Sequence, residues 1–225
     1  MTIPFYVPPE QLIKDKAEFA RKGIARGRSI VAIEYADGVL LMAENPSRTL
    51  HKISEIYDRL AFAGAGRYNE FENLRQGGIR FADVTGYMYS RQDVTGIALA
   101  SAFGETLGRI FTHEMKPWEV EVLVAEVGAN GDDSRLFKVT YDGTLYDERG
   151  VSAVGGKAEQ LTEMLQTGHD EGASLDDALR KVADAFRTAE EREIGGWEAA
   201  VLDRSRSRRL FRRLSLEDLA AAEPK

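Results

Sequence analysis

The sequence predicts an α+β fold of four layers, a sandwich of two antiparallel sheets with paired helices on each outer face. Three observations support it. Apolar and polar residues alternate with strand or helix spacing in the order helix, four strands, two helices, several strands, two helices, two strands and a short helix. No repeat or linker divides the 225 residues, and 43% apolar content is enough to bury a full core. Because each apolar face needs a covering layer, we expect one domain over residues 1–225, with the sandwich at 29–214.

Composition excludes several classes of function. A net charge of -7 opposes attraction to nucleic acid or to an anionic membrane, and no run is long enough to span a bilayer or to act as a secretion signal. The absence of cysteine excludes disulfides, thiol catalysis and cysteine-bound metals, and it fits a cytoplasmic location. His51, His113 and His169 are far apart in the sequence. We therefore expect no metal and no cofactor.

The chain begins with an arm over residues 1–8, followed by a helix. Two prolines and three apolar or aromatic residues in the arm follow neither a helical nor a strand period. It is either a frayed terminus or, given Phe5 and Tyr6, a segment that binds elsewhere. Pro9 in the first turn and Gly23 as the C-cap predict a helix over 9–23.

Four strands are expected next, over 29–35, 38–44, 52–58 and 60–66. Asp37-Gly38 between two alternating apolar runs predicts a hairpin with a type I′ turn, because these residues tolerate positive φ. Lys52 stands at the start of the third strand. If Lys52 has no functional role, it is simply a surface lysine on an edge strand.

Two helices joined through Val84–Asp93 follow, the second reaching about His113. Its small residues permit close approach to a sheet or to another subunit; these are Ala100, Gly104 and Gly108. The remaining predicted elements are strands at 119–127, 136–141, 144–146 and 151–156, helices at 157–166 and after Ser174, a charged connector at 188–196, strands at 196–203 and 210–214, and a short helix with a tail at 215–225.

Longer stretches of the sequence resemble the proteasome subunits, and specifically the α-type subunit of an actinobacterial proteasome core particle. The resemblance is carried by PEQLIKDKAEFARKGIARG and YADGVLLMAENPSRTLHKISEIYDRLAFAGAGRYNEF, and strengthened by GGIRFAD, DVTG and KPWEVEVLVAEV. It covers about residues 8–214. It implies the sandwich of the N-terminal-nucleophile hydrolases with an extra N-terminal helix.

In the catalytic β-type of this family, a terminal threonine opens the first strand and a lysine on the third strand lowers its pKa. Here Arg28 or Ser29 opens the first strand, so a free amine there would require cleavage of the chain. Lys52 matches the lysine but has no nucleophile to activate, and we expect no catalytic residue. The alternative is an independent threonine hydrolase that uses Thr2 after removal of Met1.

The resemblance to the α-type implies a ring of seven identical subunits that caps β-subunit rings and admits unfolded protein substrates. The implied gate comprises Ile3, Pro4, Phe5, Tyr6, Val7, Pro8 and Pro9. The Tyr-Asp-Arg cluster common in archaeal and eukaryotic arms is absent. Lys52 matches a lysine, in a pocket between adjacent subunits, that binds the C-terminal carboxylate of a hexameric ATPase activator, and Gly66 falls where the family places backbone of that pocket.

Other charged segments allow simpler interpretations. An arginine run could contact nucleic acid, but a charged edge strand or a subunit interface with acidic partners explains it better; it comprises Arg204, Arg206, Arg208, Arg209, Arg212 and Arg213. Turn and capping roles explain Asp132-Asp133 and Asp176-Asp177, and Gly155-Gly156-Lys157 is only a fragment of a phosphate loop.

Overall fold

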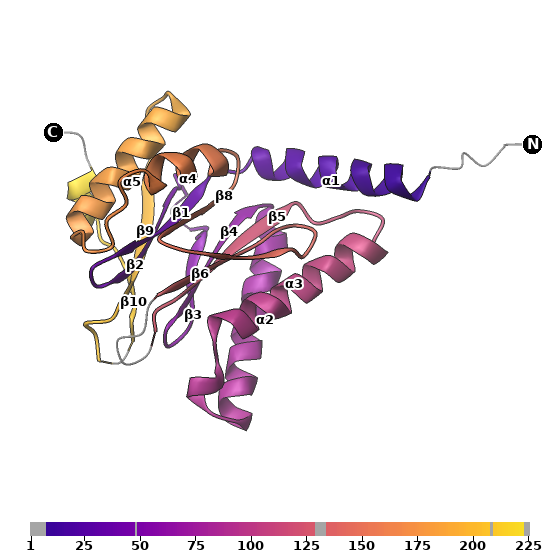
Figure 1. The fold of residues 1–225 in the computed structure, drawn as a ribbon, viewed down its shortest axis with the longest axis horizontal. Helices are drawn as coiled ribbons and strands as arrows, with labels where there is room; N and C mark the ends of the chain where they lie inside the picture. Colours follow the sequence, from indigo (N-terminus) through magenta and orange to yellow (C-terminus); the bar gives the residue numbers. More distant parts are fainter. Residues whose placement is uncertain (1–7, 48, 129–133, 208, 223–225) are drawn as a thin grey trace, which may run out of the picture.

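Two five-stranded antiparallel sheets lie face to face at the centre of the molecule, and helices cover both outer faces (Figure 1). The computed structural model describes residues 8–47, 49–128, 134–207 and 209–222. The first sheet has the order β10–β9–β2–β1–β8, with β1 at Ile30–Tyr35, β2 at Gly38–Glu44, β8 at Val151–Val154, β9 at Trp197–Asp203 and β10 at Phe211–Arg213. The second has the order β3–β4–β5–β6–β7, with β3 at Ile53–Tyr57, β4 at Leu60–Gly66, β5 at Val120–Glu126, β6 at Arg135–Val139 and β7 at Leu145–Glu148.

Helices pack in pairs on the sheets, as the order of elements predicts. The pair α4 (Ala158–Gln166) and α5 (Leu175–Glu190) covers the first sheet, and the pair α2 (Tyr68–Met88) and α3 (Gly96–His113) covers the second. A short 3-10 helix, η1 (Arg91–Asp93), joins α2 to α3. Three apolar clusters fill the spaces between the resulting four layers. The predicted αββα sandwich is confirmed.

Strand alternation explains why both sheets can be covered on two faces. In β1, Val31 and Ile33 face the α4–α5 layer, whereas Ile30 and Ala32 face the other sheet. Because successive strand residues point to opposite faces, a strand that is apolar throughout serves both layers. The cluster between the sheets contains many alanines, which let the two sheets approach closely.

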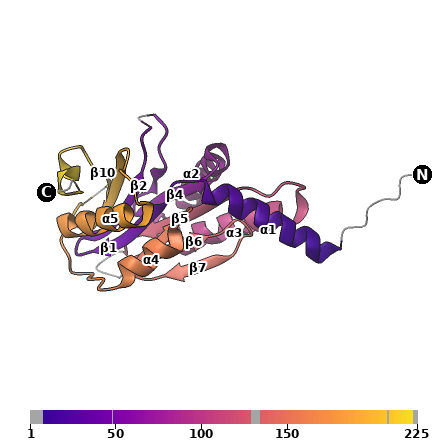
Figure 2. The ribbon, with the colours of Figure 1, turned by 90° about the horizontal axis from the view of Figure 1, so that it is seen from above.

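The first helix, α1 (Pro9–Ala25), lies outside this four-layer scheme. It runs outward from one end of the sandwich (Figure 1), and a view from above shows its first turns beyond the sheets (Figure 2). Only Ala20 and Ile24 are buried in it. The predicted C-cap was wrong: Gly23 lies inside the helix and Arg26 caps it. A Cβ at position 23 would overlap the Glu119 side chain, which would have to move to make room for it.

Three other details differ from the sequence predictions. The β1–β2 loop is Ala36-Asp37 between the paired residues Tyr35 and Gly38, and only Gly38 has positive φ, so the turn is not type I′. Backbone hydrogen bonds with distant segments hold this loop instead. Ala36 N donates to the Ala173 carbonyl oxygen, and Arg204 N donates to the Asp37 carbonyl oxygen. The connector expected at 188–196 starts later, because α5 continues to Glu190. The terminal helix is a 3-10 turn, η3 (Asp218–Ala222).

Candidate functional site

Lys52 lies just before β3, at the end of the sandwich from which α1 extends. Its Nζ donates a hydrogen bond to the Arg28 carbonyl oxygen at 3.0 Å, and its side chain is half-buried. Its own carbonyl oxygen accepts a hydrogen bond from Gly64 N at 3.1 Å, which ties the residue to β4. The ammonium is therefore held against the connection between α1 and β1 rather than lying free on an edge strand.

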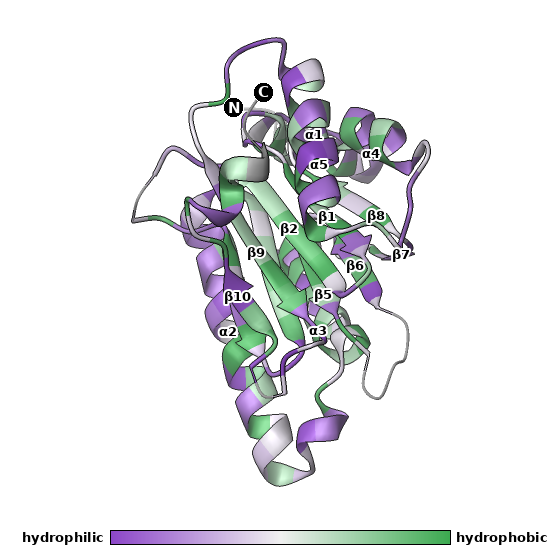
Figure 3. Ribbon diagram, turned by 90° about the vertical axis from the view of Figure 1, so that its left-hand side faces the viewer, coloured by the Kyte–Doolittle hydropathy of each residue, from purple (hydrophilic) through white to green (hydrophobic). Residues whose placement is uncertain are grey.

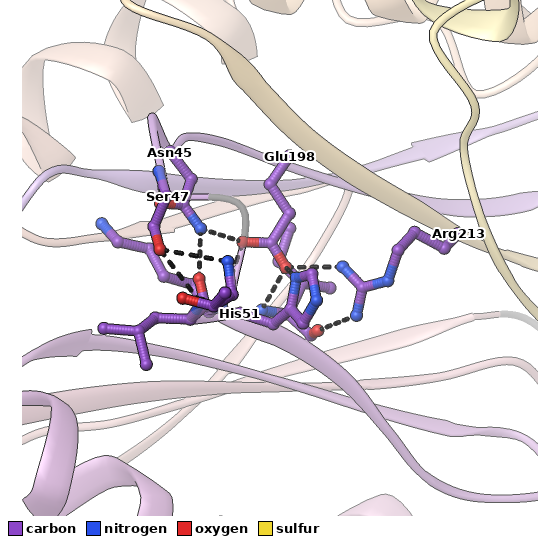
Figure 4. Close-up of polar contacts among 9 residues, drawn as sticks. Asn45, Ser47, His51, Glu198 and Arg213 are labelled. Atoms are coloured by element: carbon purple, nitrogen blue, oxygen red, sulfur yellow. Dashed lines mark hydrogen bonds and ion pairs between the residues drawn. The ribbon is translucent and has the colours of Figure 1, made fainter.

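A buried carboxylate, Glu198 on β9, organises the backbone around Lys52 (Figure 4). Its Oε2 accepts hydrogen bonds from Lys52 N at 2.9 Å and from Asn45 Nδ2 at 2.7 Å. Its Oε1 accepts from Arg213 at 2.6 Å and from Ile53 N at 3.2 Å. Because one carboxylate satisfies four donors from three segments, it fixes the start of β3 relative to the first sheet.

A second buried carboxylate, Glu44 at the end of β2, holds two arginines. Arg192 binds both of its oxygens, at 2.8 and 2.6 Å, and Gly195 N donates to it at 3.0 Å. The Arg192 hydrogen bond is the main reason why the pKa of Glu44 is lowered. Arg28 Nη1 lies 3.0 Å from Glu44 Oε1 but is not aligned for a hydrogen bond, so this buried donor has no hydrogen-bond partner in the described part of the chain.

The environment of Lys52 lowers its pKa to about 8. Burial is the largest cause, because it penalises the charged form, and the neighbouring Arg28 charge adds to it. Glu198 and Glu44 act in the opposite direction. The amine is therefore still mostly protonated at neutral pH, and an incoming anion at this site would stabilise its charged form.

Gly66 lies at the end of β4 beside the same connection. Its φ is +111°, and an added Cβ would overlap the Glu119 carbonyl oxygen. A Cβ built on Gly27 would lie 3.0 Å from Gly66 N. The structure thus places both sequence candidates, Lys52 and Gly66, against residues 27–28. It shows glycine to be required at 66 for backbone packing.

The first strand does not begin with a free amine. The chain continues from α1 through Arg26 to Ser29 and into β1. Ser29 is buried, and its Oγ accepts a hydrogen bond from Lys157 N at 2.9 Å. A reactive amino terminus would have to lie at the start of β1. That position is occupied by the continuous main chain and by the buried side chain of Ser29.

The other predicted gate and acidic residues fall partly outside the described ranges. Pro8 precedes α1 and is exposed, and Pro9 begins that helix. Thr2, Asp132-Asp133, Arg208 and the gate residues Ile3, Pro4, Phe5, Tyr6 and Val7 lie outside the described residues. Among the described residues, no group of histidines and carboxylates could hold a metal, and no helix is both long and apolar enough to cross a membrane.

The remaining charged candidates are engaged in structural contacts. Ser174 caps α5 by accepting from Asp177 N, and the backbone N–H of Lys157 binds Ser29. β10 is an edge strand, as the arginine run indicated, and several of these arginines bind carboxylates of the same chain.

Sequence reasoning missed the two carboxylates that shape the site. Glu44 ends the apolar run GVLLMAE, and Glu198 stands near the start of WEAAVLD. An acid within an otherwise buried strand is the available signal, since such a group needs partners. Their partners are distant in sequence, 148 residues away for Glu44 and Arg192, so the sequence did not identify them.

These features define a class: the αββα sandwich of the N-terminal-nucleophile hydrolases, with a helix and a continuous chain leading into the first strand. A family model described as proteasome subunit matches residues 24–202. The chain belongs to this family and groups with its actinobacterial alpha-type members. It is 55% identical to "Proteasome subunit alpha" of Parafrankia sp. over 95% of this chain and 93% of the relative, and 54% identical to that of Thermobifida fusca over 98% and 90%. The protein of that name from Thermomonospora curvata is 52% identical over 98% of this chain and 99% of the relative.

Proposed function

We propose that this chain is a non-catalytic subunit of the α-ring of a proteasome, with seven copies forming a gated pore above catalytic β subunits. The observation that carries the proposal is the contact between Lys52 Nζ and the Arg28 carbonyl oxygen. The lysine faces the start of the first strand, where a nucleophile would be needed. The group that its ammonium contacts there is the carbonyl oxygen of a peptide bond. A hydroxyl without an adjacent base and a positioned amine is a weak nucleophile.

The alternative hydrolase that uses Thr2 is disfavoured by the length of α1. With 17 residues and about 1.5 Å of rise per residue, Pro9 lies roughly 24 Å from the end of the helix near Lys52. Residues 2–8 would have to run fully extended back along α1 to reach the site. Catalysis needs a nucleophile held within hydrogen-bond distance of its partners.

The exposed apolar surface of α1 supports assembly with neighbouring copies. Leu12 is 49% exposed, Ile13 56% and Phe19 47%, on a helix that extends beyond the sandwich. Several large apolar side chains exposed on one helix often mark a surface that a partner covers. In the proposed ring, the helices would pack on one another, and the arm, residues 1–8 with Pro9 at its base, would close the axial pore.

Lys52 and Gly66 would form part of a pocket for the C-terminal carboxylate of a hexameric ATPase activator, which delivers unfolded protein. The half-buried Lys52 ammonium is a cationic donor for such a carboxylate, and Arg28, whose Nη1 forms an ion pair with Glu44 at 3.0 Å, adds positive charge nearby. A charge-assisted hydrogen bond contributes about 1.5 to 3 kcal/mol. A particle of this kind would work in the cytoplasm, and the lack of cysteine suits that compartment.

The test is to assemble the full chain with a proteasome β subunit and to measure the hydrolysis of a substrate peptide. The rate is compared with and without a second, synthetic peptide that carries the C-terminal sequence of the ATPase activator, and the quotient of the two rates is the stimulation ratio. Lys52→Ala should still form rings but lose most of this ratio, whereas Lys181→Ala on α5 should keep it. Equal stimulation in both variants would reject the docking site.

Deletion of residues 1–8 tests the gate in the same particles. Peptide hydrolysis should rise severalfold without activator, because the pore would stay open. An unchanged rate would reject the gate, and absence of rings from the unaltered chain would reject the ring itself.

A further inference from the structure

Lys52 differs from other lysines of the chain in what surrounds its amine. Carboxylates hold three of the others, and carbonyl oxygens near the ends of α3 and α4 hold two more; these are Lys22, Lys116 and Lys138, then Lys16 and Lys181. Lys52 Nζ donates one hydrogen bond, to a single carbonyl oxygen, and no carboxylate among the described residues forms an ion pair with it. Burial without an anionic partner favours the neutral form of an amine.

The two buried carboxylates around Lys52 are already engaged by arginines. Arg192 binds both oxygens of Glu44, and Arg213 binds Glu198 at 2.6 Å (Figure 4). Backbone N–H groups donate to the same two carboxylates. Neither carboxylate is therefore free to become the counter-ion of the lysine.

The remaining surroundings of Lys52 are apolar or cationic. Figure 3 shows β2 and β9, the strands that carry the two carboxylates, as hydrophobic over most of their length. Arg28 adds a positive charge, and His51, 3.4 Å from Glu198, adds another when it is protonated. Burial and the Arg28 charge together lower the pKa of Lys52 from 10.5 to about 8.

The hydrogen bond of Lys52 fixes the amine and leaves its lone pair unused. A neutral amine still has N–H groups, so it can keep the bond to the Arg28 carbonyl oxygen, and the lone pair then points away from that oxygen. The backbone of the residue is held on both sides, since its N–H donates to Glu198 and its carbonyl oxygen accepts from Gly64 N. The side chain is partly exposed, so a small reagent can approach a nucleophile that is held in place.

We propose that Lys52 is an acylation site, at which the neutral amine takes the acyl group of a small acyl phosphate. The nitrogen lone pair attacks the carbonyl carbon, a C–N bond forms, and the C–O bond to phosphate breaks. The proton lost by nitrogen ends on the leaving phosphate. Four cationic side chains and two carboxylates give this cluster a net positive charge, which attracts an anionic donor.

Acylation would regulate the docking site, and this part of the inference rests on the proposed function. The product is a neutral amide, which no longer offers a cation to a carboxylate. An acylated subunit would therefore fail to hold the C-terminal carboxylate of the activator.

Acetyl phosphate added to the folded full chain tests the acylation site, with peptide mapping by mass spectrometry at each lysine. At pH 7.5 about a quarter of an amine with a pKa of about 8 is neutral, against roughly 0.1% at a pKa of 10.5. A less basic nucleophile is also weaker, which removes part of this gain. Lys52 should still react at least about tenfold faster than Lys14 and Lys22, which are exposed on α1.

The pH profile separates a reactive amine from a merely accessible one. The rate at Lys52 should level off above about pH 8.5, whereas the rates at Lys14 and Lys22 should keep rising to about pH 10. In concentrated urea the advantage of Lys52 should vanish, because it depends on the folded surroundings. Equal rates at Lys52 and Lys22 in the folded chain would overturn the proposal. So would labelling of Lys52 by neutral acetic anhydride but not by acetyl phosphate.

The regulatory part is tested by treating the chain alone and then assembling it with an untreated β subunit, so that the β subunit stays unmodified. The stimulation ratio should fall in proportion to the acetylated fraction of Lys52, and a loss that does not follow this fraction would overturn the regulation. If Lys52→Ala keeps its stimulation while Lys52 reacts fast, the docking is wrong and the acylation site stands. If Lys52→Ala loses stimulation while Lys52 reacts no faster than Lys22, the docking stands and the acylation site is wrong.

Discussion

The Lys52 end of the sandwich and the outer face of α5 both carry clustered ion pairs, yet they differ in burial. Near Lys52, the side chains of Glu44 and Glu198 are 1% and 6% exposed, and each also accepts backbone N–H groups. On α5, Asp184 binds Arg187 at 2.8 Å while remaining 74% exposed. The carboxylates near Lys52 are therefore part of the buried interior, whereas the ion pair on α5 lies on a solvated surface.

The difference shows how the same residue types serve two purposes. A buried carboxylate that loses its partners is costly, because desolvation is no longer offset, so it holds its donors in one geometry. An exposed pair exchanges its partner for water at almost no cost. The Lys52 end can therefore position an ammonium with accuracy, whereas α5 cannot position a charge in this way. Paired substitutions test this contrast, beginning with the largest effect.

Replacing Glu198 should have the largest effect. Glu198→Ala leaves Arg213 and three other donors without their acceptor, and we expect a loss of about 3–5 kcal/mol in the free energy of unfolding. Urea unfolding, followed by circular dichroism at fixed protein concentration, measures it. Glu198→Gln keeps the shape and one acceptor oxygen and should lose less. A loss below about 1 kcal/mol for the alanine variant would mean that the cluster does not organise β3.

Two glycines give the next contrast. Gly66→Ala forces a side chain onto a residue with φ +111° and into the Glu119 carbonyl oxygen, so we expect a loss of about 2–4 kcal/mol. Gly77 lies in α2 with nothing within 4 Å of its Cβ position, and Gly77→Ala should raise stability by about 0.5–1 kcal/mol. The same urea titration compares them. Equal effects at both sites would contradict the close packing at Gly66.

The sequence predicted the layers well because those depend on local patterns. Strand alternation in β1 and helical spacing in α3 are each visible within a few residues. The start of β3 beside Lys52 followed to within one residue from the apolar run after it, since the strand begins at Ile53. The type of the β1–β2 turn did not follow, because contacts from distant segments at Ala36 and Asp37 determine it.

The candidate site was predictable only as single residues. Lys52 and Gly66 came from resemblance to a family, and nothing local indicated that both contact residues 27–28. Glu198 could be recognised as an acid in an apolar strand, but its bonds to Asn45 and Lys52 span 153 and 146 residues. Such contacts arise from sheet stacking, which a single sequence does not specify.

The pH dependence of stability should report the burial of Lys52. Its folded pKa is about 8 against an ordinary value of 10.5, so above pH 8 the unfolded state holds more protons and stability should rise with pH until about 10.5. The gain from this residue is about 2 kcal/mol, somewhat below the full shift because the site is partly open. Unfolding measured from pH 7 to 10.5 should show the rise in the unaltered chain relative to Lys52→Met. Parallel curves would mean that the amine is not desolvated.

The smallest effect is expected on α5. Asp184→Ala removes the exposed pair with Arg187, and because water solvates both groups well, stability should change by about 0.5 kcal/mol or less. Urea unfolding at low and at about 1 M salt measures it, since salt screens what little attraction exists. Glu44→Ala, which strips Arg192 of a buried partner, is the matched variant and should retain a large loss at both salt concentrations. Similar losses for the two variants would show that burial does not separate these regions, and the positioning assigned to the Lys52 end would have to come from the backbone alone.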